Sequence, residues 1–463
     1  MRSASDAGVR PFYEARAWKA AWSPEAAESL REILGERAGH GLDRLRFLPA
    51  DMPQEDAARD VALTKAALRY AIALSRGAVD PTNLYDVYTL PRPEDDLVAG
   101  LNTALNDGRL REWLGGLAPQ SQSYRVLSKT YVDARGSSEG RSMSPIALDG
   151  IAEKGDSGPH VAAIVGRLRE LGFLQSEGGK SKDVYTQEVA SAVERLQASF
   201  GLTVDGVVGP STLQALNFGP AARSRALAVA LERQRWLERS PPGNRIDVNI
   251  AAAELAYYKD GTLVDRRKVV VGEPGNPTPQ LQSQLYRLVA NPTWTVPKSI
   301  ERNELSDVSS AYLRRNNMVR EGGWIVQQSG PDNALGLVKF DMDNQHAIYL
   351  HDTNAPRLFS EERRYFSHGC VRVEDAWGFA RMLASDVQIT GSWQSARAKD
   401  KETFVRLPEP IPVRLIYQDV VVSDGKPVYL LDPYGWNDAI AAKLGFEAGA
   451  RKRINLQARD IGP

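Results

Sequence analysis

The spacing of apolar and polar positions divides the chain into a helical first part and a β-rich later part. In residues 1–148, apolar residues recur at steps of three and four, most regularly over Val61–Ser75, which gives one buried helix face. Residues 97–114 repeat the pattern, with a break at Asn106-Asp-Gly108 that indicates a turn. The sequence therefore predicts a helical scaffold over residues 1–148, and no candidate catalytic group falls within it.

Residues 150–218 predict a compact unit of three helices. Two periodic segments, Val161–Leu171 and Val189–Phe200, are each followed by a glycine, the residue most favoured just after a helix end. A third, shorter helix is expected from Pro210, because proline is favoured at a first helical position. The Asp205-Gly206 pair before it supplies a turn.

From Arg245 onward the apolar period changes to two, which is typical of β-strands. The Lys259–Thr262 segment has the composition of a hairpin turn. Strands are expected at Arg245–Ile250, Glu254–Tyr258, Lys268–Gly272, 285–289 and 347–350.

One charged and helical stretch interrupts this β-rich region. Residues 297–323 are expected to form an inserted cap that covers or lines a site within a domain spanning residues 219–425. Residues 426–463 form a C-terminal extension. The predicted fold class is multidomain α+β, and 463 residues exceed what a single core usually supports.

Composition excludes several partners. The chain has 58 Lys and Arg against 58 Asp and Glu, and this zero net charge argues against nucleic acid or an anionic membrane held by bulk electrostatics. No stretch approaches the roughly 18 apolar residues of a membrane span. The first residues lack the apolar run of a signal peptide, so export can be inferred only from a substrate.

The strongest chemical signal surrounds the sole cysteine, Cys370, in the tetrapeptide Ser367-His368-Gly369-Cys370. Another histidine, His351, lies upstream. A thiolate is the attacking form of cysteine, and a free thiol titrates near about 8.5 unless its surroundings change it. Because imidazole titrates near neutral pH, the pattern predicts Cys370 as a nucleophile and His351 as its proton acceptor and donor.

The remaining motif residues receive supporting roles. In extended backbone, residues two apart share a face, so His368 could approach the thiol, or it could order the loop. Gly369 lets the backbone pass close to a substrate, and the amides of Gly369 and Cys370 are candidate oxyanion donors. Arg372 could bind a carboxylate, lower the thiol pKa or form a surface ion pair. Trp294 and Tyr349 are expected either to line the cleft or to pack in a core.

Two segments resemble known families. The run from Asp205 to Thr212 resembles the Asp-Gly-x-x-Gly-x-x-Thr hallmark of three-helix peptidoglycan-binding modules. His351, fifteen further residues and then Ser367-His-Gly-Cys-Val-Arg372 resemble the catalytic motif of L,D-transpeptidases. Nearby blocks that match this family are Asn291–Pro297, Asn333–Gly336 and Tyr349–Thr353. The order of segments resembles the large Gram-negative branch, and the match adds Asn333 to the substrate-binding candidates.

The resemblance implies a peptidoglycan stem tetrapeptide as substrate. Cys370 would take the acyl group, D-alanine would leave, and an amine of a second stem would complete a 3-3 crosslink. Water as acceptor would give an L,D-carboxypeptidase, and another acceptor or crosslink register would use the same site. The resemblance also implies a periplasmic protein of wall biogenesis and cell shape, contacts with stem peptides, glycan and other wall-synthesis proteins, and acylation by carbapenems. No cofactor is implied.

Three alternatives compete with this interpretation. Three histidines and a cysteine could hold zinc, but their spacing is unlike a helical His-x-x-x-His pair and no suitable acid lies near them, so we expect no metal. In papain-like peptidases the cysteine begins a helix and the histidine follows it, whereas His351 precedes Cys370. A non-catalytic wall-binding protein would not need His351, His368 and Cys370 together.

Overall fold

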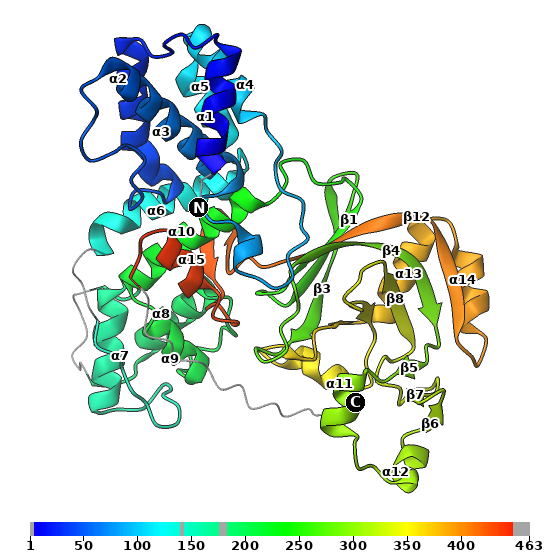
Figure 1. The fold of residues 1–463 in the computed structure, drawn as a ribbon. Helices are drawn as coiled ribbons and strands as arrows, with labels where there is room; N and C mark the ends of the chain where they lie inside the picture. The colour runs from blue at the N-terminus through cyan, green and yellow to red at the C-terminus, as the bar shows by residue number, and fades with distance from the viewer. Residues whose placement is uncertain (1–3, 139–142, 176–182, 448–463) are drawn as a thin grey trace. The chain divides into compact units, whose positions relative to one another are not determined.

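A computed structural model describes residues 4–138, 143–175 and 183–447. The described residues form two compact units, shown in Figure 1. The helical unit comprises residues 4–86, 91–239 and 418–447, and the sheet unit comprises residues 87–90 and 240–417.

The first half of the helical unit is a set of α-helices, as the sequence predicts. Its members are α1 (Ala4–Ala15), α2 (Pro24–Gly35), α3 (Asp56–Arg76), α4 (Leu97–Asn106), α5 (Leu110–Leu117) and α6 (Gln122–Ser138). The side chain of Ser23 caps α2 by accepting a hydrogen bond from the Ala26 amide, and Pro24 occupies the first turn. The expected turn at residues 106–108 separates α4 from α5.

The predicted three-helix unit is present as α7 (Pro159–Glu170), α8 (Gln187–Ser199) and α9 (Pro210–Leu216). The buried side chain of Gln197 holds the Asp-Gly turn in place. Its amide oxygen accepts from the amides of Asp205 (3.1 Å) and Gly206 (2.9 Å), and its Nε2 atom donates to the Thr212 hydroxyl at 3.1 Å. These contacts explain why Asp, Gly and Thr stand at this spacing.

The long helix α10 (Pro220–Trp236) lies within the helical unit. Arg233 is 1% exposed and forms an ion pair with buried Asp419. The hairpin β13 (Val420–Ser423) and β14 (Lys426–Tyr429) and helix α15 (Asn437–Lys443) belong to the same unit. The sheet unit begins at residue 240 and ends at residue 417, and the 219–425 boundaries of the catalytic domain stay a prediction.

The sheet unit is built on a nine-stranded sheet in the order β10-β3-β11-β9-β8-β4-β12-β1-β2. Strand β2 also pairs with β3, so the strands from β3 to β2 close into a ring. The strands are β1 (Arg245–Asn249), β2 (Glu254–Lys259), β3 (Thr262–Gly272), β4 (Leu281–Ala290), β8 (Val338–Met342), β9 (Leu350–His351), β10 (Tyr365–Ser367), β11 (Val371–Val373) and β12 (Thr403–Ile416). Helices α13 (Ala376–Asp386) and α14 (Thr390–Arg397) pack against this sheet (Figure 1).

The inserted cap has its own small core. Helices α11 (Lys298–Glu304) and α12 (Ser310–Arg315) fall where the sequence predicts helical structure. A three-stranded sheet in the order β5-β7-β6 accompanies them, formed by Trp294–Thr295, Trp324–Gln327 and Met318–Glu321. Buried residues of the cap, including Trp294, Leu313 and Ile325, form one hydrophobic cluster. The cap thus contains strands that the predicted helical segment 297–323 did not include.

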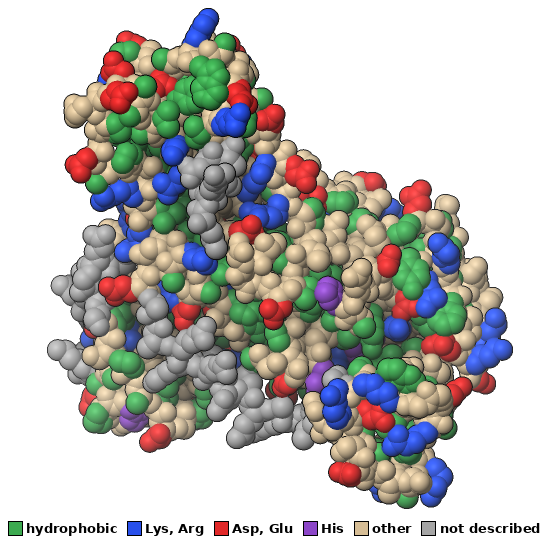
Figure 2. Space-filling view, viewed as in Figure 1, with side chains coloured by type: hydrophobic (Ala, Val, Ile, Leu, Met, Phe, Trp, Pro, Cys, Tyr) green, Lys and Arg blue, Asp and Glu red, His purple; other side chains and the backbone are tan. Residues whose placement is uncertain are grey.

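The architecture confirms the predicted fold class, a mixed helical and sheet protein with a helical first part and a β-rich later domain. In the part of the chain that the structure describes, no helix combines the length and apolarity that crossing a bilayer requires. Over the face drawn in Figure 2, acidic and basic side chains are interspersed.

Candidate active site

The register of two short parallel strands brings the predicted catalytic residues together. Cys370 directly precedes β11, which runs beside β9 so that Arg372 is the neighbour of His351. Because side chains alternate along a strand, Cys370 and Arg372 share one face with Tyr349 and His351. On the other side of β9, Lys339 pairs with His351. Five candidate side chains, carried by three adjacent strands or by the residues just before them, therefore lie on one face of the sheet.

The thiol of Cys370 is partly exposed. Its Sγ atom lies 3.7 Å from the Ala347 carbonyl oxygen and can donate a weak hydrogen bond to it. Burial raises the pKa of Cys370, and hydrogen bonds from Tyr349 and the charges of Lys339 and Arg372 oppose that rise. The resting side chain is consequently a thiol at neutral pH and requires a base before it can attack.

His351 is the candidate for that base. Its side chain is only 5% exposed. Burial, with a further contribution from the charge of Arg372, lowers the pKa of His351 to about 3. A hydrogen bond with the Asp352 backbone raises this pKa but is the smaller effect. The imidazole is therefore neutral near pH 7 and has a lone pair with which to accept a proton. Among the described residues, its buried Nδ1 atom has no hydrogen-bond partner.

The loop that carries the nucleophile is fixed by two hydroxyl groups. Ser367 Oγ accepts from the Gly369 amide at 3.2 Å and lies 2.5 Å from the Cys370 carbonyl oxygen. Thr278 Oγ1 accepts from the Gly272 amide at 2.8 Å and donates to the Gly369 carbonyl at 2.8 Å. Gly369 has φ of +113°, a conformation that favours glycine. Thr278, which is fully buried, carried no signal in the sequence.

The two expected oxyanion donors, the amides of Gly369 and Cys370, differ in whether they already donate a hydrogen bond. The Gly369 amide is already used by Ser367. Within the described part of the chain, no acceptor is bonded to the Cys370 amide. The Cys370 amide is therefore the better placed donor for a developing oxyanion.

His368 contacts the inserted cap. Its ring is exposed, and its Nε2 atom lies 2.8 Å from Oε1 of Glu304, the last residue of α11. The expectation that His368 faces the thiol relied on an extended backbone from 368 to 370. The positive φ of Gly369 interrupts that path, and the structure instead places His368 as a link between the motif and the cap.

Tyr349 joins the catalytic face to the cap. It is half-buried and packs against the cluster that contains Trp294. Its hydroxyl shares hydrogen bonds with the side chains of Trp294 and Cys370, and burial raises the pKa of Tyr349 well above its usual value. The Lys339 ammonium lies 4.3 Å from the centre of the Tyr349 ring. Trp294 is only 5% exposed, so it supports Tyr349 from within the cap.

The other two substrate-binding candidates differ in position. Arg372 is buried beside His351, which places its charge on the catalytic face and not at the surface. Asn333 is 2% exposed, and its amide group donates to the carbonyls of Pro292 and Gln328 and accepts from the Leu335 amide. The geometry of Asn333 is that of a loop-ordering residue, and a contact with substrate stays a prediction.

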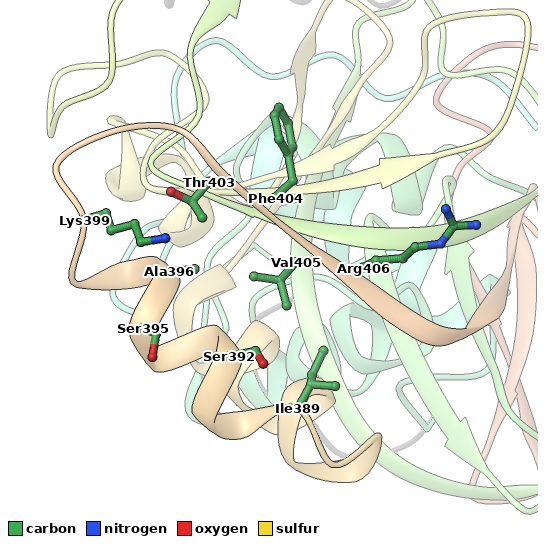
Figure 3. A pocket seen from close by; sticks show the side chains of 9 residues that line it. All are labelled: Ile389, Ser392, Ser395, Ala396, Lys399, Thr403, Phe404, Val405 and Arg406. Atoms are coloured by element: carbon green, nitrogen blue, oxygen red, sulfur yellow. The ribbon is translucent and has the colours of Figure 1, made fainter.

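A cavity of about 300 Å³ lies elsewhere in the sheet unit, between α14 and β12 (Figure 3). Figure 3 shows Ser392 and Ser395 on the helix and Phe404 and Arg406 on the facing strand. None of the candidate catalytic residues lines it. In addition, the described residues contain no group of three or more His, Cys, Asp or Glu side chains that could hold a metal ion.

The part of the chain that carries this thiol, imidazole and glycine loop matches a defined family of domains. Residues 243–427 match YkuD, the L,D-transpeptidase catalytic domain. Residues 157–216 match the family described as "Putative peptidoglycan binding domain", and residues 7–130 match the Scaffold domain. The chain carries a YkuD L,D-transpeptidase catalytic domain and a peptidoglycan-binding domain. This finding confirms the resemblance on which the sequence interpretation rests.

Individual relatives align with only part of this chain. A protein of Haemophilus influenzae named "Putative L,D-transpeptidase" is 32% identical over 225 residues, which are 42% of this chain and 45% of the relative. The N-acetylmuramoyl-L-alanine amidase CwlL of Bacillus licheniformis is 36% identical over 128 residues, 26% of this chain and 35% of the relative. The chain thus aligns with less than half the length of either relative.

Among solved structures, the L,D-transpeptidase of Xylanimonas cellulosilytica (its residues 123–326) is 20% identical, with 59% of this chain and all of that chain covered. The TM-score of this match is 0.22, too low to carry an argument about function.

Proposed function

We propose that this protein is a peptidoglycan L,D-transpeptidase that uses Cys370 as a covalent nucleophile. The observation that carries the proposal is the placement of Cys370 and His351 on one face of two neighbouring parallel strands. The accompanying peptidoglycan-binding domain supports peptidoglycan as the substrate.

In the proposed acylation step, neutral His351 removes the proton from Cys370 Sγ. The thiolate then attacks the carbonyl carbon of the third residue of a stem tetrapeptide, in the peptide bond that links this residue to the terminal D-alanine. The Cys370 amide stabilises the resulting oxyanion, an interaction that typically contributes about 3 kcal/mol. When the tetrahedral species collapses, the C–N bond breaks, the D-alanine amine takes the proton from His351, and a thioester remains on Cys370.

In the second step, the side-chain amine of a diaminopimelate on another stem attacks the thioester. His351 accepts the proton of that amine and returns it to the departing sulfur, which gives a 3-3 crosslink and the free enzyme. Attack by water gives a tripeptide by the same proton transfers, so L,D-carboxypeptidase activity is the second candidate function, and another acceptor or crosslink register uses the same chemistry. The contact of Tyr349 with the thiol favours the cap as the surface that positions the acceptor.

Arg372 is the proposed partner for a carboxylate of the stem peptide. Its positive charge lies on the catalytic face, where it also favours the thiolate of Cys370. In the same proposal Tyr349 borders the substrate, while Trp294 and Ser367 act by holding Tyr349 and the Gly369 loop in place. The protein would work outside the cytoplasm, in the periplasm, and contribute to wall biogenesis and cell shape with wall-synthesis proteins as partners.

The test is incubation of the protein with a purified disaccharide tetrapeptide, followed by mass analysis of products and of the intact protein. Wild-type protein should form crosslinked dimer, with a transient mass increase that corresponds to the disaccharide-tripeptide acyl group. Cys370→Ala should form neither, whereas the nearly isosteric Cys370→Ser controls for the shape of the site and should lose turnover with its fold intact.

Incubation with a carbapenem provides an independent readout of the same sulfur. A stable one-to-one adduct on wild-type protein that is absent from Cys370→Ala supports the proposal. Tripeptide without dimer would favour the carboxypeptidase. Unchanged substrate, together with no adduct on the wild-type protein, would refute the proposed function and favour a wall-binding protein without activity.

A further inference from the structure

A groove in the helical unit is lined by none of the residues that the proposed transpeptidase mechanism uses. It has a volume of about 960 Å³ and is formed by α1, α2, α3 and the segment between the first two. Its walls include Tyr13, Trp18, Trp22, Glu28, Arg31 and Arg59. Pockets of about 300–1,000 Å³ are the usual size for organic ligands. Over this helical region, the face in Figure 2 shows hydrophobic side chains among charged ones.

The most unusual wall residue is Trp18. Its side chain is 68% exposed, although tryptophan is usually covered. Ala17 and Trp18 both have positive φ, +49° and +59°, a conformation that is unfavourable for residues with a Cβ atom. The indole is also fixed in direction, because it stacks on the Tyr13 ring with an interplanar angle of 8° and 6.5 Å between ring centroids. An exposed ring held at a strained turn is typical of a functional position.

The buried carboxylate of Asp60 fixes the aromatic residues of this wall through hydrogen bonds. Asp60 is 8% exposed and accepts hydrogen bonds from the Tyr13 hydroxyl and from the amides of Ala21 (2.9 Å) and Trp22 (3.0 Å). The Trp22 indole donates to the Thr64 hydroxyl at 2.9 Å. The directions of the rings are thus set by the fold before any ligand arrives, which lowers the entropic cost of binding.

The charges of the groove are paired with one another. Arg31 Nη1 lies 2.8 Å from Glu28 Oε2, and Arg59 forms an ion pair with Asp56. With buried Asp60, the lining holds three carboxylates and two guanidinium groups, so the groove does not favour an anionic ligand. Guanidinium and carboxylate groups still exchange hydrogen bonds with hydroxyl and amide groups. A flat apolar surface beside such groups suits a ring that is apolar on its faces and hydroxylated at its rim, as a pyranose sugar is.

We propose that this groove binds a neutral oligosaccharide, with one sugar ring stacked on Trp18, and that the glycan strand of peptidoglycan is its ligand. The class of ligand is argued from the groove itself, whereas the choice of this glycan rests on the proposed function. The site is distinct from the peptidoglycan-binding domain at residues 157–216. The protein would then hold its polymer through two separate sites of the helical unit.

The probe is a neutral hexamer of N-acetylglucosamine, titrated calorimetrically into the full chain. Trp18→Ala should weaken binding by at least about tenfold, because it removes the stacking ring. Trp18→Phe keeps an aromatic face and should stay within about threefold of wild type. Lys19→Ala is the matched control, because Lys19 is exposed beside Trp18 and does not line the groove. Circular dichroism of each variant checks that the helices are retained.

Two results would overturn the proposal. One is a wild-type protein that does not bind the hexamer at millimolar concentration. The other is equal affinity of Trp18→Ala and wild type, which would assign the sugar to residues 157–216. Cys370→Ala should bind the hexamer as wild type does. A wild-type protein that shows Trp18-dependent binding of the hexamer but is not acylated would refute the proposed function and leave the glycan site standing.

Discussion

Nε2 of His368 lies 2.8 Å from Oε1 of Glu304, so the catalytic motif and the inserted cap are joined by a direct side-chain contact. His368 belongs to the loop that carries the nucleophile, and Glu304 ends α11. The cap also reaches the catalytic face through Tyr349, which packs on the cap cluster and hydrogen-bonds the thiol. These two contacts give the cap a way to influence the reacting sulfur.

We predict that Glu304→Gln weakens the hold of the cap on the motif and slows acylation of Cys370. Because the contact is partly exposed, the free-energy change of such a pair is about 0.2–1 kcal/mol, and the rate should fall by about 1.4- to fivefold. Acylation by a carbapenem, followed by intact mass, measures this rate. Asp307→Asn, an exposed charge change on the same cap, should have no effect. An equal loss in both variants would show that cap charge, and not the contact with His368, matters.

The second prediction concerns stability in acid. Burial lowers the pKa of His351 to about 3 and that of His40, in the helical unit, to about 4. An unfolded imidazole titrates near about 6.5, so below that pH the unfolded chain binds more protons than the folded one. The contribution of these two histidines to stability should therefore be fully present above about pH 6.5 and should be lost as the pH drops through about 4 and toward 3.

Urea unfolding at about pH 7 and about pH 5 measures this dependence. His351→Gln and His40→Gln should each remove part of the difference between the two pH values. His160→Gln is the control, since this histidine is only partly buried at the start of α7. A pH dependence that survives in the double variant of His351 and His40 would contradict the assignment and point to the carboxylates.

The sequence predicted those features that depend on local patterns. The helix over Val61–Ser75 lies within α3, and the short motif containing Cys370 identified the domain family. What the sequence did not predict depends on contacts between distant residues. The strands of the cap are two to four residues long, too short to display a period. The sequence left two roles open for His368, and its partner, Glu304, could not be predicted because the distant cap supplies it.

The third prediction tests a residue that no sequence pattern singled out. The Thr278 hydroxyl connects the Gly272 amide to the Gly369 carbonyl. Thr278→Val keeps the shape but leaves both groups without this partner in a buried place, which should cost about 1–3 kcal/mol of stability. Alkylation of Cys370 by iodoacetamide should also slow by about tenfold, because the loop that orients the sulfur loosens.

Thr278→Ser retains the hydroxyl and is the matched control for that experiment. It should restore most of the alkylation rate while leaving the small space of the lost methyl group. If Thr278→Val and Thr278→Ser are slowed equally, the methyl group and not the hydrogen-bond bridge determines the position of the loop.

The last prediction concerns the ion pair that ties the C-terminal segment into the helical unit. Arg233 and Asp419 are 1% and 2% exposed, and Asn437 also contacts both side chains. Removing one partner of a buried pair leaves the other charge uncompensated, so Asp419→Ala should lower the free energy of unfolding by about 3–5 kcal/mol. Urea unfolding monitored by circular dichroism measures the loss. The control is Glu14→Gln, which breaks the exposed pair with Arg10 and should change the free energy of unfolding by less than about 0.5 kcal/mol.

Because Asp419 belongs to the helical unit and Cys370 to the sheet unit, carbapenem acylation of Asp419→Ala below the unfolding transition should be unaffected. A loss of acylation in folded Asp419→Ala would mean that the sheet unit requires residues 418–447 for its activity, contrary to the division of the chain into two compact units.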